Sequence, residues 1–190
     1  MAPLALTWLR VALGPTLIVL ALAWPHPGAF GSCLLAAFLS DVFDGVLARK
    51  LGVATAMLRR LDSIADTIFY LAALLAVWIL HPEVILANLV LLTVLVGLEL
   101  ARYALDFWKF GREASYHMWT AKIWGIALFL GFFSILVMGN EGLPATLAIA
   151  VGIIADVEGL LISMLLPSWH HDVPSVAHAW RIRQFERKAI

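Results

Sequence analysis

Charged side chains are scarce in this sequence. They make up 14% of its 190 residues, whereas 63% are hydrophobic, and the mean hydropathy is +0.94. A soluble domain is about a quarter charged and about half apolar. The composition therefore argues against an ordinary soluble domain and predicts a single integral membrane domain over residues 1–190, solvated largely by lipid.

Other absences narrow the range of functions. Lys and Arg together number 13, as do Asp and Glu, so the formal net charge is zero and nucleic acid is not expected as a partner. The single cysteine, Cys33, cannot form an internal disulfide and is expected to be a small buried apolar residue. The sequence contains no low-complexity tract and no convincing internal repeat.

The apolar residues form six segments long enough to cross a bilayer, which takes about 20 residues in a helix. Breaks rich in proline, glycine or polar residues separate several of them, as in WPHPG, HPE and GNEG. The sequence predicts an all-α polytopic membrane protein with six transmembrane helices at about 8–25, 28–49, 61–81, 83–106, 117–138 and 143–166, followed by an interfacial tail at 167–190. Because Arg10 lies within the first segment and more spans follow, we expect a retained span rather than a signal peptide.

The positive charges support this threading. With six spans, all 13 Lys and Arg fall on one side of the membrane, and the three connections on the other side carry none. Cytoplasmic loops hold the Lys and Arg excess. We therefore expect both termini to face the cytoplasm. The compact loops and the lack of a transit peptide favour the inner membrane of a bacterium.

Four aspartates lie where two predicted spans approach the cytoplasmic side. Asp41 and Asp44 are three residues apart near the end of the second span, and Asp62 and Asp66 are four apart at the start of the third. Both spacings place a pair on one helix face, with Cβ atoms about 5–6 Å apart. Two such pairs on adjacent antiparallel helices are expected to converge on one small volume.

Carboxylates at this depth are costly unless cations compensate their charge. Ligands that offer only oxygen favour Mg²⁺ or Mn²⁺, and a cluster this acidic suits two ions. Two neighbouring metals are suited to phosphoryl displacement, since they clamp the attacking and leaving oxygens. Gly45 and Ala48, on the same side as the second-span pair, leave room for a ligand. The alternative is that the aspartates cap helices and pair with Arg49, Arg59 and Arg60.

The stretch from Asp41 to Asp66 resembles the signature of the CDP-alcohol phosphotransferases. That pattern is DxxDGxxAR, eight residues, G, three residues, D, three residues, D. The sequence has DVFDGVLAR and then DSIAD at the same spacing, and only the second glycine is replaced, by Leu58. Leu6–Arg10, LTWLR, is similar to the family's LTxxR entry into its first span. The length of the chain and the six predicted spans also fit the family. Leu58 in place of the family glycine is expected to change the shape of the entrance to the acceptor site.

The resemblance implies a reaction. A CDP-linked lipid, usually CDP-diacylglycerol, binds through its pyrophosphate to two divalent metals; an alcohol hydroxyl then attacks the lipid-side phosphorus and CMP leaves. The implied metal ligands are Asp41, Asp44, Asp62 and Asp66, with Mg²⁺ or Mn²⁺ as cofactor. Asp66 is also the implied general base. The implied nucleotide site is formed by Asp41, Gly45, Ala48 and Arg49. Family members are commonly homodimers, so a homodimer is possible here.

Cationic side chains are candidates for the acceptor site, because most acceptors in the family carry a phosphate or carboxylate. The candidates are Arg59, Arg60, Arg102, Arg112 and Lys122. The first two equally suit an interfacial linker. Arg102 stands near Glu99 and Asp106 at helical spacings, which also fits a structural triad. Lys122 is retained from a GKxKT-like stretch of the family.

Two acids lie inside the sixth span. Asp156 and Glu158 point about 200° apart on a helix, so one of them is expected to pair with Lys122 or Arg102. In the tail, Trp169 and Trp180 suit headgroup depth.

Several functions remain open at this point. Besides the transferase, the acidic cluster suits a Mg²⁺ transport protein, a membrane prenyltransferase or a catalytically inactive homologue. The acceptor is open among glycerol 3-phosphate, inositol phosphate, serine and a lipid such as phosphatidylglycerol. The small size and the basic cytoplasmic face favour a phosphorylated polyol.

Overall fold

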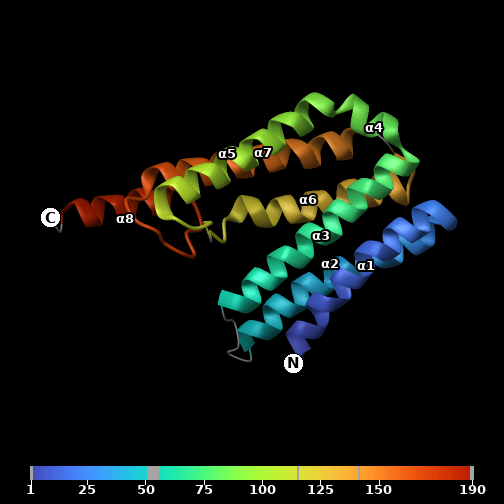
Figure 1. The fold of residues 1–190 in the computed structure, drawn as a ribbon, viewed down its shortest axis with the longest axis horizontal. Helices are drawn as coiled ribbons and strands as arrows, with labels where there is room; N and C mark the ends of the chain where they lie inside the picture. Colours follow the sequence, from blue (N-terminus) through green and yellow to red (C-terminus); the bar gives the residue numbers. More distant parts are fainter. Residues whose placement is uncertain (1, 51–55, 115, 141, 189–190) are drawn as a thin grey trace. The chain divides into compact units, whose positions relative to one another are not determined.

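The protein is helical throughout most of the chain, as a computed structural model shows (Figure 1). The structure describes residues 2–50, 56–114, 116–140 and 142–188. In these ranges the helices are α1 (Ala2–Ala23), α2 (Pro27–Lys50), α3 (Ala56–Leu80), α4 (Pro82–Ala87), α5 (Leu89–Phe110), α6 (Trp119–Leu136), α7 (Leu143–Leu165) and α8 (Val176–Lys188). The all-α prediction is confirmed.

Four helices have the length and composition needed to cross a membrane. Within the described residues these are Leu4–Ala23, Arg60–Leu80, Trp119–Leu136 and Leu143–Leu165. The sequences of α2 and α5 contain several acidic and basic residues, and these helices are not among the four. The chain is therefore a multi-pass membrane protein. That it has six spans, and that both termini face the cytoplasm, stay predictions. Cys33 in α2 is half-buried rather than buried, which an apolar thiol tolerates in lipid.

The segment predicted as one helix at 83–106 forms two helices. α4 ends at Ala87 and α5 begins at Leu89, with Asn88 between them at φ −105° and ψ 11°. The Oγ1 of Thr146 donates a hydrogen bond of 2.9 Å to Oδ1 of Asn88. An asparagine side chain competes with helical backbone bonding, which explains a break that apolar content alone did not reveal.

Contacts divide the chain into two compact units. The first consists of Met1–Ala87 with Phe132–Gly142, and the second of Asn88–Gly131 with Leu143–Ile190. The first unit therefore contains α1–α4 and the end of α6, and the second contains α5, most of α6, α7 and α8.

In the first unit, α1 packs against both α2 and α3. Small residues allow the close approach of α1 and α3: Ala65, Ala72, Ala73 and Ala76 of α3 are all buried. A Cβ at Gly14 of α1 would lie 3.4 Å from the Cβ of Ala72. Small residues let membrane helices approach closely and gain dispersion contacts. Because α1 contacts both partners, a side chain of α1 is able to reach residues of α2 and α3 together.

In the second unit, α7 packs against α5 and α8. Its buried residues recur every three or four positions: Ala145, Ala148, Ala155, Asp156, Gly159, Ile162 and Ser163, with Gly152 between them. A Cβ at Gly152 would lie 2.6 Å from Nε1 of Trp124 and 2.9 Å from Cδ1 of Leu95, so only glycine fits this packing. α8 joins the end of α7 through a cluster that contains the buried Leu166 and Ala179.

Candidate metal centre

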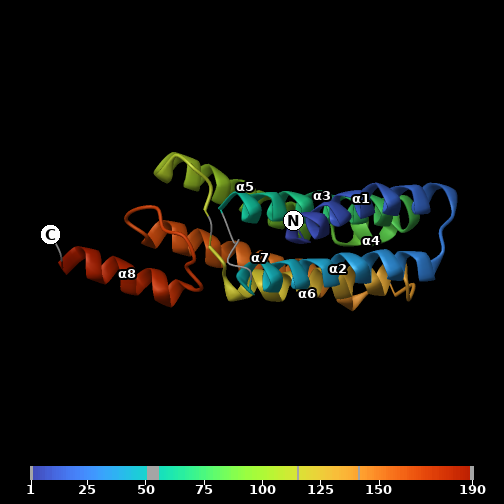
Figure 2. The same ribbon diagram turned by 90° about the horizontal axis from the view of Figure 1, so that it is seen from below.

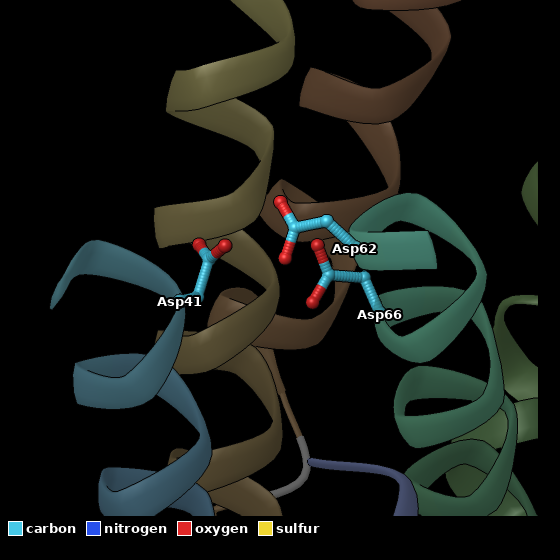
Figure 3. A group of neighbouring side chains, drawn as sticks. All are labelled: Asp41, Asp62 and Asp66. Atoms are coloured by element: carbon cyan, nitrogen blue, oxygen red, sulfur yellow. The ribbon is translucent and has the colours of Figure 1, made fainter. Parts of the chain in front are cut away.

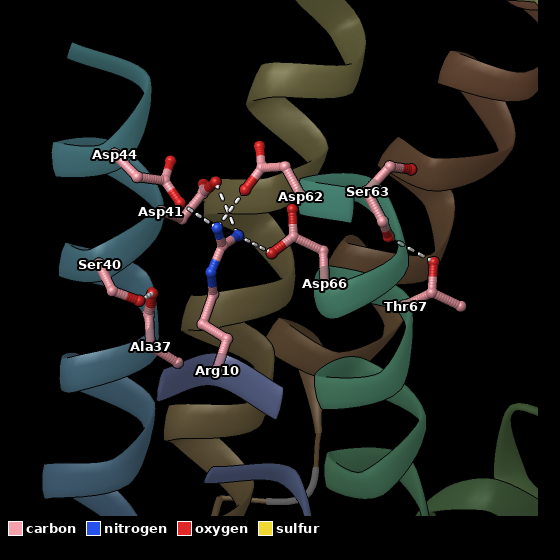
Figure 4. A network of polar contacts seen from close by, with 9 residues as sticks. All are labelled: Arg10, Ala37, Ser40, Asp41, Asp44, Asp62, Ser63, Asp66 and Thr67. Carbon is pink, nitrogen blue, oxygen red and sulfur yellow. Dashed lines mark hydrogen bonds and ion pairs between the residues drawn. The ribbon is translucent and has the colours of Figure 1, made fainter. Parts of the chain in front are cut away.

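Four carboxylates and one guanidinium meet in the first unit (Figure 4). Arg10 extends from α1 between Asp41 and Asp44 of α2 and Asp62 and Asp66 of α3. Nη1 of Arg10 donates a hydrogen bond of 3.1 Å to Oδ1 of Asp41 and another to Asp66, while Nη2 donates to Asp44 and Asp62. The structure thus brings together the two acidic pairs that the spacing predicted would converge.

Neighbouring polar side chains are satisfied within their own helices. The hydroxyl of Ser40 donates to the carbonyl of Ala37 at 2.8 Å, and that of Thr67 donates to the carbonyl of Ser63 at 2.9 Å (Figure 4). Such back-bonding is common for Ser and Thr inside helices. These hydroxyls therefore bond to the backbone of α2 and α3.

The cluster is buried on one side and open on the other. Arg10 is only 1% exposed and Asp44 is buried, whereas the side chains of Asp41, Asp62 and Asp66 are 47%, 31% and 32% exposed. One guanidinium carries a single positive charge, which balances the charge of only one carboxylate. A cluster with this excess of acids favours a further cation, and its open side is that of the three partly exposed acids.

Three of the acids are placed to share a metal ion. Asp41, Asp62 and Asp66 each offer one carboxylate oxygen, and these atoms lie within 4.8 Å of one another (Figure 3). A donor set made only of carboxylates suits hard divalent ions such as Mg²⁺ and Mn²⁺. The residues therefore fit a divalent metal. Asp44, the fourth ligand expected from the sequence, lies on the buried side of the cluster.

Arg10 is the residue of this site that the sequence reasoning missed. LTWLR was noted only as similar to the family's entry into its first span. A signal for its role was present, because a charged residue inside an apolar span usually faces the bundle interior and has a partner. The acids that Arg10 binds lie 31 to 56 residues away, so spacing along the sequence did not identify them.

Part of the expected nucleotide and acceptor sites lies outside the described residues. This applies to the side chains of Gly45, Ala48, Arg49 and Arg59, and to that of Leu58. Arg60, another acceptor candidate, is exposed near the start of α3. The nucleotide site therefore stays a prediction.

Arg102, an acceptor candidate in the second unit, is held by two acids. Its Nη2 lies 3.1 Å from Oε1 of Glu99, and its Nε lies 3.3 Å from Oδ1 of Asp156. The prediction that one acid of the last span pairs with Arg102 or Lys122 is thus confirmed. Of the possible triad along α5, the contact with Glu99 is confirmed, whereas the second ion-pair partner of Arg102 is Asp156, which α7 supplies by packing against α5.

Asp106 takes part in a different network. It is fully buried and accepts a hydrogen bond of 2.5 Å from the hydroxyl of Ser163 and one of 3.3 Å from the backbone N–H of Ala114. The hydroxyl of Ser163 also lies 3.1 Å from that of Tyr116. This network connects the segment after α5 to the end of α7, so Asp106 stabilises the packing of these two parts of the chain.

The other candidates of the second unit have contacts of their own. Glu158 accepts hydrogen bonds from the hydroxyl of Thr120 at 2.5 Å and from the backbone N–H of Val176 at 3.3 Å. Lys122 is exposed, and its Nζ lies 4.3 Å from the ring centre of Trp119.

The guanidinium of Arg112 lies 4.0 Å above the ring of Trp169, which is close enough for a cation–π contact. The indole N–H of Trp169 donates to the carbonyl of Glu113 at 3.1 Å. Trp169 therefore helps to hold the tail against the segment that follows α5.

The fold and the site together define the class of this protein: it is a helical membrane protein in which four carboxylates surround one arginine. The family model for CDP-alcohol phosphatidyltransferase matches residues 1–166. The chain belongs to this family, as the resemblance implied, and its family is one of membrane phosphotransferases. Searches of curated proteins and of solved structures gave no match.

Proposed function

We propose that this protein transfers a phosphatidyl group from a CDP-alcohol, with CDP-diacylglycerol as the donor, to the hydroxyl of a small alcohol, and releases CMP. The observation that carries the proposal is the meeting of all four signature aspartates around Arg10. Membership of the family supports the chemistry.

Asp41, Asp44, Asp62 and Asp66 are the residues that would hold two ions of Mg²⁺ or Mn²⁺. When bound, such ions neutralise a pyrophosphate and make its phosphorus more electrophilic. The donor's pyrophosphate would approach from the side on which Asp41, Asp62 and Asp66 are partly exposed. Gly45, Ala48 and Arg49 follow in the signature and would contact the nucleotide.

Asp66 is the proposed general base. Its carboxylate accepts the proton from the acceptor hydroxyl as the hydroxyl oxygen forms a bond to the lipid-side phosphorus. The bond from that phosphorus to the bridging oxygen of the pyrophosphate breaks, and this oxygen leaves with CMP. A carboxylate suits this role when it lies within hydrogen-bond reach of the hydroxyl, and partial exposure leaves Asp66 accessible to a substrate.

The proposed acceptor is a phosphorylated polyol such as glycerol 3-phosphate or inositol phosphate. Arg59 and Arg60 stand within one turn before Asp62 in the sequence and are the cations that we favour for its phosphate. Arg102 and Lys122 stay as further candidates, although Arg102 already binds two acids. We place the site at the cytoplasmic face of the inner membrane, where such acceptors are dissolved.

Release of CMP tests the proposal. Purified full-length protein is incubated with CDP-diacylglycerol and Mg²⁺ or Mn²⁺ across a panel of alcohols, with EDTA and Asp66→Asn as negative controls. Asp172→Asn is a matched control, since it removes a carboxylate from a half-exposed position at φ 56°, a conformation that asparagine tolerates.

We expect CMP with one acceptor, no CMP with EDTA or Asp66→Asn, and near-normal CMP release with Asp172→Asn. Folded, metal-bound protein that releases no CMP with any acceptor would refute the transfer reaction with this donor. It would favour a metal-binding role such as Mg²⁺ transport or an inactive homologue.

A further inference from the structure

A second site is lined by residues from the end of α5, the end of α7 and α8, all within the second unit. Figure 2 shows the course of these helices. A cavity of about 280 Å³ is lined there by the cationic Lys109, Arg183 and Arg187, by the acidic Glu186 and by apolar residues that include Met164 and Leu165. None of these residues belongs to the signature of the family.

The cations come from two helices. Lys109 lies in the last turn of α5, beyond the span predicted at 83–106, and Arg183 and Arg187 are four residues apart on α8. Side chains at that spacing share one face of a helix. The two arginines therefore present two guanidinium groups to the same cavity.

Lys109 is fixed in place by the end of α7. Its Nζ donates hydrogen bonds of 2.8 Å and 3.1 Å to the carbonyls of Ser163 and Met164, which belong to the last turn of that helix. Burial and the charge of Arg183 lower the pKa of Lys109. Two like charges thus lie close enough to repel each other at this cavity.

The acid that lines the cavity, Glu186, has partners outside the group of lining residues. Glu186 lies 3.3 Å from Nε2 of His170 and accepts a hydrogen bond of 3.4 Å from the hydroxyl of Ser168. Among the residues that the structure describes, neither Arg183 nor Arg187 has an ion-pair partner. Three cationic side chains and one carboxylate therefore line the cavity, and positive charge is in excess there.

The wall of the cavity is apolar where α7 ends. Met164 is 62% exposed, and Leu165 and Leu166 follow it. On α8, Trp180 and Phe185 are exposed as well, which is typical of a helix that lies in the headgroup region of a membrane. A cationic cavity with an apolar wall is complementary to a ligand that joins an anionic phosphate to hydrocarbon.

We propose that this cavity binds the headgroup phosphate of an anionic phospholipid. Arg183 and Arg187 bind the phosphate oxygens, and an acyl chain lies along Met164 and Leu165. Basic pockets at the cytoplasmic ends of membrane helices are suited to anionic headgroups. The proposal concerns residues other than the signature aspartates and does not depend on the proposed transferase activity.

Lipid binding to the purified full-length protein tests it. Native mass spectrometry in a mild detergent counts bound phosphatidylglycerol during a titration, with phosphatidylcholine as the zwitterionic comparison. Arg187→Gln and the double variant Arg183→Gln/Arg187→Gln are compared with Arg181→Gln. Arg181 is an exposed arginine of the same helix that does not line the cavity, so its loss changes the net charge equally.

We expect one saturable phosphatidylglycerol per chain and weak binding of phosphatidylcholine. Each lost cavity arginine should weaken phosphatidylglycerol binding about fivefold. Arg181→Gln should change it less than twofold, and Arg187→Lys, which keeps the charge, should retain most of it. A thermal unfolding midpoint is measured for each variant to show that it is folded. If the double variant does not fold, the single variant Arg187→Gln, at an exposed position, provides the test.

Two results would overturn the proposal. Equal weakening by Arg181→Gln and Arg187→Gln would mean that the tail attracts anionic lipid only through its general charge. Displacement of the lipid by inorganic phosphate at the same concentration would mean that the cavity is a site for free phosphate.

Discussion

Nη1 of Arg10 donates a hydrogen bond of 3.1 Å to Oδ1 of Asp41, a residue 31 positions further along the chain. The contact joins α1 to α2, and the same guanidinium reaches Asp62 and Asp66 on α3. Arg10 therefore acts as the resident counter-ion of the acidic cluster. A divalent metal bound to the same carboxylates would supply positive charge in the same place.

Replacement of this counter-ion should have an effect that depends on metal. We expect Arg10→Gln to lower the free energy of unfolding by about 3–5 kcal/mol in EDTA, because it leaves the buried Asp44 and three partly exposed carboxylates without their cation. With saturating Mn²⁺ the loss should be clearly smaller, and Arg10→Lys should lose less than Arg10→Gln in EDTA. Denaturation followed by circular dichroism measures both conditions. Equal losses with and without Mn²⁺ would contradict the role of Arg10 as a counter-ion.

The number of bound metals is a separate prediction. We expect two Mn²⁺ ions per chain, measured by electron paramagnetic resonance of free Mn²⁺ during a titration. Asp62→Asn should weaken Mn²⁺ binding about tenfold or more, because it removes a carboxylate oxygen from the group that also contains Asp41 and Asp66. Asp172→Asn should leave binding unchanged. One ion per chain would contradict the two-metal proposal while leaving a single metal site.

The contact between Arg102 and Asp156 predicts non-additive effects on stability. Arg102→Leu leaves Asp156 buried without its cation and should destabilise the protein by about 3–5 kcal/mol. The double variant Arg102→Leu/Asp156→Leu should recover much of this loss, since replacing both members of a buried ion pair with apolar residues is often neutral. A double-mutant cycle measured by denaturation checks this. Additive losses would show that the pair is not coupled.

The close packing at Gly152 predicts that a larger residue there lowers the stability of the protein, and Gly97 offers a matched control position. Gly152→Ala would place its Cβ 2.6 Å from Nε1 of Trp124, so the helices must shift, at a cost of about 1–3 kcal/mol. Gly97→Ala on α5 meets no atom within 4 Å and should leave stability equal or slightly higher. Thermal unfolding of both variants measures the difference. Similar midpoints for the two would contradict the close packing of α7 seen at Gly152.

The break at Asn88 shows where the apolar pattern was a poor guide to helix limits. The segments on both sides are apolar, so the sequence predicted one helix at 83–106. The structure ends α4 at Ala87 and starts α5 at Leu89, and Asn88 accepts a hydrogen bond from Thr146 of α7. This contact requires that α7 lie beside the break, which the local sequence does not reveal.

The sequence by itself indicated the family and determined which acids share a helical face. Spacings of three and four residues place Asp41 with Asp44 and Asp62 with Asp66, because a helix repeats every 3.6 residues, and the order of the acids indicated the family.

Only the tertiary structure decided which charges meet. Arg10 binds all four acids and Arg102 binds Asp156 rather than Asp106, because helix packing decides which faces touch. A charge inside a membrane needs a partner, and a partner on another helix is available only where the helices pack closely, as they do at the small residues Gly14 and Gly152.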